Sequence, residues 1–330
     1  KCDWSSDVCS SDLDDTNNTS DVFVRDTVSD TTVRVSVRSD GGEANAASYA
    51  PRISGDGRYV VFGSSASNLV SGDTNGEPDV FRHDLQTGKT IRVSVTYKGR
   101  QANGDSGSAD ISDDGTRIVF VSSARNLVAA RDRTPSYSEV YLRDVAAKRT
   151  VRVAVNGSGR QANEQVDGPI ISGDGSTIAF QTAAGNLVRG DDNGQSDVFV
   201  VKVATGAVRI ASRSAGGTAS DGQSWADDLS RTGRYLLLET LATNLVPGDT
   251  NGTTDVYRKD LQRGGVVRVS VADDESQSSD SGTWGRISET GRYVTFTSQA
   301  TDLVPGPDSF STTDCFLRDI TDRKSTRLNS

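Results

Sequence analysis

The sequence is poor in residues on which several classes of protein depend. Among 330 residues it has no methionine, one histidine, three cysteines and 6% aromatic residues. No apolar run approaches the roughly 18 residues of a membrane-spanning helix, which excludes such a span. The net charge of −9 leaves no basic excess for phosphate contacts, so we expect no nucleic-acid partner. No stretch keeps a 3.6-residue apolar period, which excludes a repeat built of helices.

The two ends differ from the rest of the chain. Residues 1–13 (KCDWSSDVCSSDL) and 323–330 (RKSTRLNS) match no repeat unit and resemble translated sequencing-adapter read-through. Together with the missing methionine, they lead us to expect a fragment with non-native ends, and both segments are set aside in predicting the fold. Without the first segment only Cys315 remains, so we expect no disulfide framework.

A repeat of about 58 residues organises the remaining chain. Segments like ISGDGRYVVF begin at Ile53, Ile111, Ile171, Leu229 and Ile287, and each is followed by Asn-Leu-Val or Asp-Leu-Val and a DVFRHDL-like run. An IRVSV-like run closes each complete unit. We therefore expect a propeller over residues 14–322. Its parts are a rear half-unit (14–49), units at 50–107, 108–167, 168–225 and 226–283, and a front part (284–322).

Each unit contains four short runs of β-type residues separated by turn signals. Asp56-Gly57 and its equivalents favour a tight hairpin between the first two runs, and Thr87-Gly88 favours another between the last two. Four antiparallel strands in every unit predict an all-β fold, a β-propeller of four-stranded blades. The half-units could combine into a fifth blade, or the chain could be an incomplete six-bladed ring. A β-solenoid fits less well, because its coils are shorter and need no hairpins.

The S-x-D-G-R-Y-V-x-F step, followed by D-V-F-x-R-D and T-G, resembles the TolB-like, WD-repeat-like bacterial propellers. The resemblance covers about residues 14–321 and implies a monomeric protein that is secreted, periplasmic or on the cell surface. It implies a binding or scaffold role for a protein or glycan ligand. The excess length of each unit lies in two loops, one between the second and third strands and one leading to the next unit. Both should emerge on one face, which is the expected binding surface.

The first long loop carries Asp and Asn at a fixed spacing around a glycine. Such oxygen ligands suit Ca²⁺, and the loop is similar to the calcium loops of integrin-type propellers without their first acid. The candidate ligands are Asp73, Asn75 and Asp79, then Asp191, Asn193 and Asp197, then Asp249, Asn251 and Asp255. The alternative is an Asx turn, in which these side chains bond their own backbone. The ligand count, short of the about six oxygens that Ca²⁺ takes, favours the turn.

The second long loop and the residues after it supply the other candidates for the binding face. They are Gln101, Asn103, Gln161, Asn163, Trp225 and Trp284. The amides could contact a ligand or satisfy loop backbone. The tryptophans could stack on sugars or pack between blades. Hydrogen bonding to loop backbone is the commoner use of such amides, and packing between blades is the commoner use of such tryptophans.

The sequence favours a binding protein over an enzyme. No G-x-S-x-G nucleophile elbow occurs. His83 aligns with Arg25, Arg143, Lys259 and Arg318, which predicts a solvated strand position rather than a catalytic base. The alternative is a propeller glycosidase or lyase, or the accessory propeller of a prolyl-oligopeptidase-type hydrolase. Its support is that Arg52, Asp110, Asp228 and Arg286 differ from unit to unit at one position of the first strand.

Overall fold

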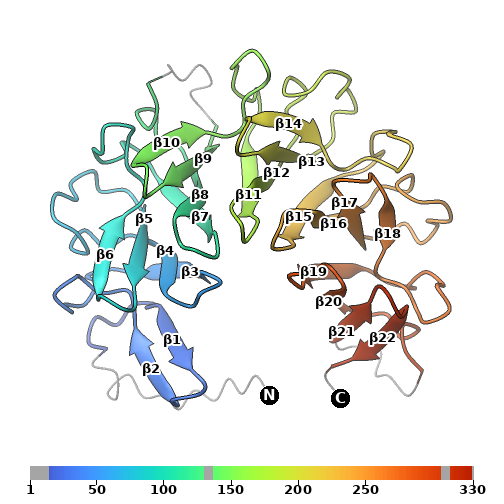
Figure 1. The fold of residues 1–330 in the computed structure, drawn as a ribbon, viewed down its shortest axis with the longest axis horizontal. Coiled ribbons are helices and arrows are strands. Elements are labelled where there is room, and N and C mark those ends of the chain that lie inside the picture. The colour runs from blue at the N-terminus through green and yellow to red at the C-terminus, as the bar shows by residue number, and fades with distance from the viewer. Residues whose placement is uncertain (1–14, 130–136, 306–312, 329–330) are drawn as a thin grey trace.

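The computed structural model describes residues 15–129, 137–305 and 313–328. Over these ranges the chain is all-β, and it has no helix long and apolar enough to cross a membrane. Five sheets have four antiparallel strands and one has two. The sheets are arranged around a common centre like the blades of a propeller, with the first strand of each four-stranded sheet nearest that centre (Figure 1). The predicted fold class is confirmed at this level.

Each four-stranded sheet is a meander in which strand order follows sequence order. We number the sheets as blades 1 to 5 and call the two-stranded sheet the half-blade. The innermost strands are β3 (Ser48–Ile53), β7 (Ser106–Ile111), β11 (Val166–Ile171), β15 (Ser224–Leu229) and β19 (Gly282–Ile287). The second strands are β4 (Tyr59–Ser64), β8 (Arg117–Ser122), β12 (Thr177–Thr182), β16 (Tyr235–Thr240) and β20 (Tyr293–Ser298). The third strands are β5 (Asp79–Asp84), β9 (Glu139–Asp144), β13 (Asp197–Lys202), β17 (Asp255–Asp260) and β21 (Asp314–Asp319). The outermost strands are β6 (Lys89–Arg92), β10 (Arg149–Arg152), β14 (Ala207–Ile210), β18 (Val266–Arg268) and β22 (Lys324–Arg327).

The half-blade contains β1 (Phe23–Asp26) and β2 (Thr31–Arg34) and stays separate from blade 5. The two lie on either side of the opening at the bottom of Figure 1. The half-units therefore do not combine into one blade among the described strands, and the arrangement is five complete sheets plus a two-stranded one.

Two details of the blade limits differ from the expected ones. Each innermost strand begins two residues before the expected boundary, as at Ser48 and Ser106. The last blade runs beyond residue 322, because Lys324–Arg327 pairs with β21. Pairing at a sheet edge requires only an extended backbone segment. The side-chain pattern of residues 324–327 therefore did not predict a strand. Residues 1–13 lie outside the described residues.

The Asp-Gly signal folds as expected into the hairpin between the first two strands. In blade 1 the Ser54 hydroxyl accepts a bond from the Tyr59 backbone N–H at 2.9 Å, and Asp56 accepts one from the Arg58 N–H at 3.0 Å. Gly57 closes the turn with a φ of 71°, in the left-handed region that favours glycine. The same Ser-x-x-Gly geometry recurs in the other blades, which explains the strongest repeat in the sequence.

The hydrophobic core lies between blades rather than within one. One cluster joins Val61 and Val80 of blade 1 to Ile118 and Phe120 of blade 2, and equivalent clusters link every following pair. A further cluster packs Val22 of the half-blade against blade 1. Because each blade buries its apolar face only against a neighbour, the channel geometry depends on the whole row of blades.

The basic column on the third strands is buried, contrary to the predicted solvated position. His83, Arg143, Lys259 and Arg318 are 5%, 8%, 7% and 2% exposed. Lys259 donates to the carbonyl of Arg213 at 2.6 Å, and Arg318 donates to that of Ala272 at 3.2 Å. These cations satisfy carbonyls at the end of the preceding blade, a long-range role that strand alternation alone does not reveal.

Candidate functional site

The two long loops of each blade meet on one face, as expected. In blade 1 the Gln101 side chain accepts a bond from the backbone N–H of Thr74 at 3.1 Å and donates to Asp73 at 2.7 Å. The Asn75 amide donates to the carbonyl of Ala102 at 3.1 Å. Blade 4 repeats this arrangement with Gln277. The loops therefore form a preorganised rim on the face opposite the short hairpins.

In two of the three Asp–Asn loops an arginine lies against the aspartates. Arg92 approaches Asp73 at 3.1 Å and Asp79 at 3.2 Å. Arg268 likewise approaches Asp249 at 3.4 Å and Asp255 at 3.6 Å. A guanidinium group thus supplies the positive charge at the place where a cation would be needed. In the half-blade, the Arg34 guanidinium likewise lies against acidic residues, Asp21 and Glu43.

The Asp–Asn loop of blade 3 lacks both the arginine and the glutamine that contact this loop in blades 1 and 4. Ile210 faces Phe199 where Arg92 faces Phe81, and Ala219 stands where Gln101 stands in blade 1. Burial and the nearby Asp197 carboxylate raise the pKa of Asp191 to about 6. Asn193 bonds Asp197 at 2.9 Å and accepts the Gln195 N–H at 2.9 Å, so the loop is also an Asx turn.

The amides expected on the binding face are largely engaged within the protein. Gln101 bridges its loops, and Gln161 is 8% exposed and accepts a bond from Arg152 at 3.1 Å. Asn103 and Asn163 are exposed, although the backbone N–H of each donates to the next blade's Asn. Asn103 also lines a hollow of about 450 Å³ between blades 1 and 2.

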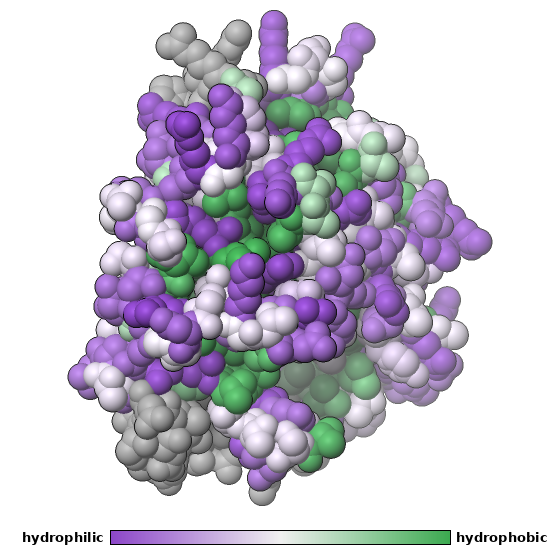
Figure 2. All heavy atoms as spheres, turned by 60° about the vertical axis from the view of Figure 1, so that its left-hand side comes forward, coloured by the Kyte–Doolittle hydropathy of each residue, from purple (hydrophilic) through white to green (hydrophobic). Residues whose placement is uncertain are grey.

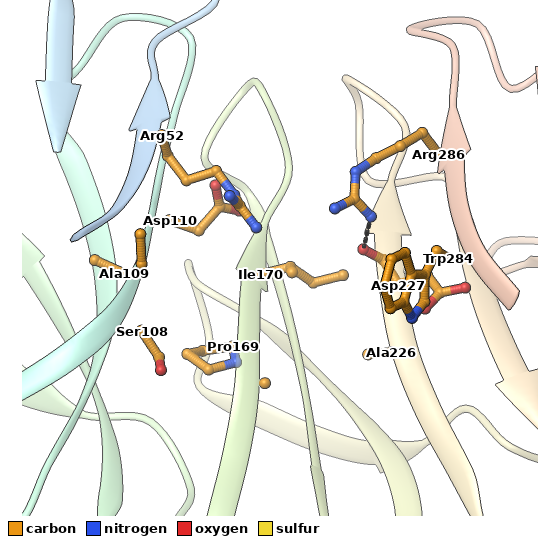
Figure 3. Close-up of a pocket in the computed structure, with 12 residues that line it drawn as sticks. Arg52, Ser108, Ala109, Asp110, Pro169, Ile170, Ala226, Asp227, Trp284 and Arg286 are labelled. Carbon is orange, nitrogen blue, oxygen red and sulfur yellow. Dashed lines mark hydrogen bonds between the residues drawn. The ribbon is translucent and has the colours of Figure 1, made fainter. Parts of the chain in front are cut away.

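The two candidate tryptophans differ sharply in exposure. Trp225 on β15 is half-buried, whereas Trp284 on β19 is 78% exposed. Packing between blades therefore does not explain Trp284. Its side chain lies in the wall of the central channel (Figure 3).

The innermost strands of all five blades line a pocket of about 430 Å³ in this channel. Every one of these strands has a β-bulge against its neighbour. At the bulge Ala50, Ser108 and Trp284 have φ angles of 50°, 45° and 56°, in the left-handed region. Such residues are strained and concentrate at functional sites, because bulges redirect side chains.

The four residues that vary between units lie at or beside this pocket. Arg52, Asp110 and Arg286 line it, and Figure 3 shows the two arginines extending from opposite sides. Asp110 accepts the backbone N–H of Ile171 at 2.8 Å, and Asp228 accepts that of Ile287 at 2.9 Å. Burial raises the pKa of Asp110 to about 6 and also raises that of Asp228. The aspartates thus join neighbouring blades, while the arginines extend into the pocket.

A carboxyl pair at the pocket escaped the sequence analysis. Asp227 and Glu239 lie in hydrogen-bond contact. Asp227 accepts the Gly285 N–H at 3.3 Å, and Glu239 accepts the Trp284 N–H. Burial and the Glu239 carboxylate raise the pKa of Asp227 to about 9, and burial raises that of Glu239. The available signal was Glu239 itself, a carboxylate at the position that Gln181 holds in blade 3.

His83, the only histidine, is also held in the fold. It is buried on β5 with its Nδ1 2.9 Å from the Thr90 hydroxyl, and burial lowers its pKa. The carboxyl pair differs from the acids of glycosidases, which stand about 5 Å or more apart around the scissile bond.

Comparison with known proteins identifies the fold. No family model and no curated protein matches the chain. Among solved structures, a TolB-type protein from Agrobacterium tumefaciens covers 93% of this chain and 87% of its own at 16% identity, with a TM-score of 0.52. In fold, the chain is a TolB-like β-propeller.

Other matches of the TolB-like propeller are enzymes. An oligogalacturonate lyase in complex with manganese covers 94% of this chain and 70% of its own at 12% identity, with a TM-score of 0.56. An acylaminoacyl peptidase from Pyrococcus horikoshii covers 86% of this chain and 38% of its own at 13% identity, with a TM-score of 0.50. At such identities these likenesses establish the fold alone.

Proposed function

We propose that this TolB-like propeller is a non-catalytic binding or scaffold protein. It engages a protein or glycan on the face with the long loops, around the mouth of the channel. The observation that carries the proposal is the hydrogen bonding between these loops, through Gln101 in blade 1 and Gln277 in blade 4. A rim ordered before binding loses little conformational entropy when a ligand is bound. A monomer that is secreted, periplasmic or on the cell surface is part of the proposal.

The surface composition supports a polar ligand. On the side shown in Figure 2, hydrophilic residues predominate and hydrophobic ones form small, separated groups. Large contiguous apolar patches mark sites of obligate assembly, and this view has none among its described residues. The side seen in this view is therefore suited to polar partners, in keeping with a glycan or a polar protein surface as the ligand.

A propeller glycosidase or lyase is the second candidate. The observation in its favour is the Asp227–Glu239 pair beside an open pocket, with the pKa of Asp227 raised to about 9. Against it, both carboxyl groups accept backbone N–H groups of β19, which gives them a structural role.

One experiment separates the two candidates. The purified protein is applied to a glycan array, and the same glycans are analysed by mass spectrometry after incubation with it. We expect binding without any change in glycan mass. Cleavage or elimination products that disappear in Asp227→Asn would overturn the binding proposal in favour of the enzyme.

The calcium part of the proposal is confined to blade 3. Asp191, Asn193 and Asp197 are the candidate ligands, because the arginine and glutamine of the other loops are Ile210 and Ala219 here. Backbone carbonyls and water would complete the coordination that Ca²⁺ prefers.

A further inference from the structure

Trp284 combines exposure with a backbone conformation that tryptophan rarely adopts. Its side chain is 78% exposed and its φ is 56°. The carboxyl groups of Glu239 and Asp227 hold the N–H groups of Trp284 and Gly285, and so fix this conformation. A large apolar ring kept in solvent at the expense of strain has no packing explanation. A flat apolar surface in a channel wall is suited to stacking against a sugar ring.

The two arginines of the pocket have hydrogen-bonding capacity left. Arg52 donates to the carbonyl of Pro51 at 3.1 Å, and Arg286 donates to those of Gly285 and Asp227 at 2.8 and 3.4 Å. Among the described residues, neither guanidinium lies within 4.0 Å of a carboxylate, in contrast to Arg92 and Arg268 in the loops. The planar fork of arginine binds a carboxylate in a bidentate manner.

The acidic groups around the pocket are engaged by the protein. Asp110 and Asp228 accept N–H groups of the next innermost strand, and Asp227 and Glu239 contact each other. Arg52 and Arg286 are therefore the charged side chains of the pocket that keep guanidinium N–H groups available to a ligand, while Asp110, Asp227 and Asp228 attract them at longer range (Figure 3).

We propose that the channel pocket binds a saccharide that carries carboxylate groups. A sugar ring stacks on Trp284, and Arg52 and Arg286 bind the carboxylates from opposite sides. The Ser108 hydroxyl, which also lines the pocket, is available to sugar hydroxyls. The volume of about 430 Å³ lies within the range of small-ligand pockets. The proposal rests on the proposed binding function and narrows its ligand class.

The test is calorimetric titration of the full chain with a uronic acid disaccharide and with the neutral hexose disaccharide of the same linkage. We expect the uronic acid disaccharide to bind more tightly, with an affinity that falls as salt is added. Equal affinity for the two sugars would overturn the role of the arginines. Absence of binding to either would overturn the pocket assignment.

Variants separate binding from folding. Trp284→Gly removes the ring and relieves the left-handed strain, so its melting temperature should be unchanged or higher while affinity falls by roughly tenfold or more. Tyr293→Ala, at another exposed aromatic residue outside the pocket lining, is the control and should bind normally. Arg52→Gln with Arg286→Gln should abolish the preference for the uronic sugar, whereas exposed Arg263→Gln should not.

The outcome also distinguishes this inference from the proposed function. If the array finds a glycan or protein ligand whose affinity is unchanged in Trp284→Gly and in the double arginine variant, the binding function holds and the pocket assignment fails. If affinity falls in both, the pocket is the site.

Discussion

Asp73, Asp191 and Asp249 occupy the same place in three loops, yet their electrostatic surroundings differ. Arg92 and Arg268 lie against the first and third, whereas Asp191 has Ile210 at that position and only the longer-range charge of Arg213. The Asp-Asn spacing predicted all three loops alike, because the deciding arginine lies about 20 residues further along the chain on the outermost strand. β14 pairs in the same register as β6, but its arginine, Arg209, stands one residue earlier and pairs with Val200.

Ca²⁺ should therefore bind only the Asp–Asn loop of blade 3. We expect Ca²⁺, and not Mg²⁺, to stabilise the fold by about 1–3 kcal/mol at saturating concentration, measured as a rise in melting temperature. Asp191→Asn should remove this rise, and Asp249→Asn should leave it intact because Arg268 already lies against that aspartate. A rise that persists in Asp191→Asn, or no rise with the unaltered protein, would disprove the site.

The Asp227–Glu239 pair predicts a fold that weakens in alkali. The pKa of Asp227 is raised to about 9 and that of Glu239 is also raised, so the folded chain holds a proton that the unfolded chain releases. This contribution is complete below about pH 4 and is lost as the pH rises toward about 9. The free energy of unfolding should fall by about 1–3 kcal/mol between pH 5 and pH 9 in urea titrations.

Glu239→Gln provides the comparison for that pH dependence. Gln181 makes the equivalent bond to the Ala226 N–H at 3.0 Å, so glutamine fits this position. The variant should be at least as stable at pH 8 and should show a flatter pH profile. A profile as steep as that of the unaltered protein would place the titrating group elsewhere.

At the scale of elements, the hairpins and strands were predictable because their signals are local. The Asp-Gly turns, the Thr-Gly turns and the alternating runs each depend on a few adjacent residues. The burial of His83, Arg143, Lys259 and Arg318 was not predictable, because it depends on the neighbouring blade: Lys259 and Arg318, for example, donate to carbonyls of the preceding blade. The bulges that form the pocket were also missed, since no residue type marks them consistently.

The turn glycines carry a second role that a matched pair of variants can measure. Gly57 and Gly115 have φ angles of 71° and 67°, but a Cβ on Gly57 would meet nothing within 4 Å, whereas one on Gly115 would lie 2.0 Å from the ring of Tyr59. Alanine should destabilise both turns by about 1–2 kcal/mol through left-handed strain. At Gly115 we expect about 1–3 kcal/mol more, from overpacking between blades. Equal losses in urea denaturation would mean that the contact with Tyr59 contributes nothing.

For the whole molecule, the repeat predicted a propeller with its long loops on one face, and the structure has this arrangement. The number of sheets depends on whether terminal half-units pair with each other, which is a contact between distant strands that repeats alone do not specify. The pocket likewise arises where five innermost strands meet, from Arg52 on β3 to Arg286 on β19. The sequence shows that the residue type at the position of these two arginines varies between units. Only the arrangement of the blades around the centre places the two arginines opposite each other.

The most direct test of the account is hydrogen–deuterium exchange of the protein with and without a bound glycan ligand. We predict slower exchange in the long loops, such as residues 65–78 and 96–106, and in the innermost strands β3 and β19. Unchanged exchange in the long loops would contradict the proposed binding face, whether or not β3 and β19 are protected.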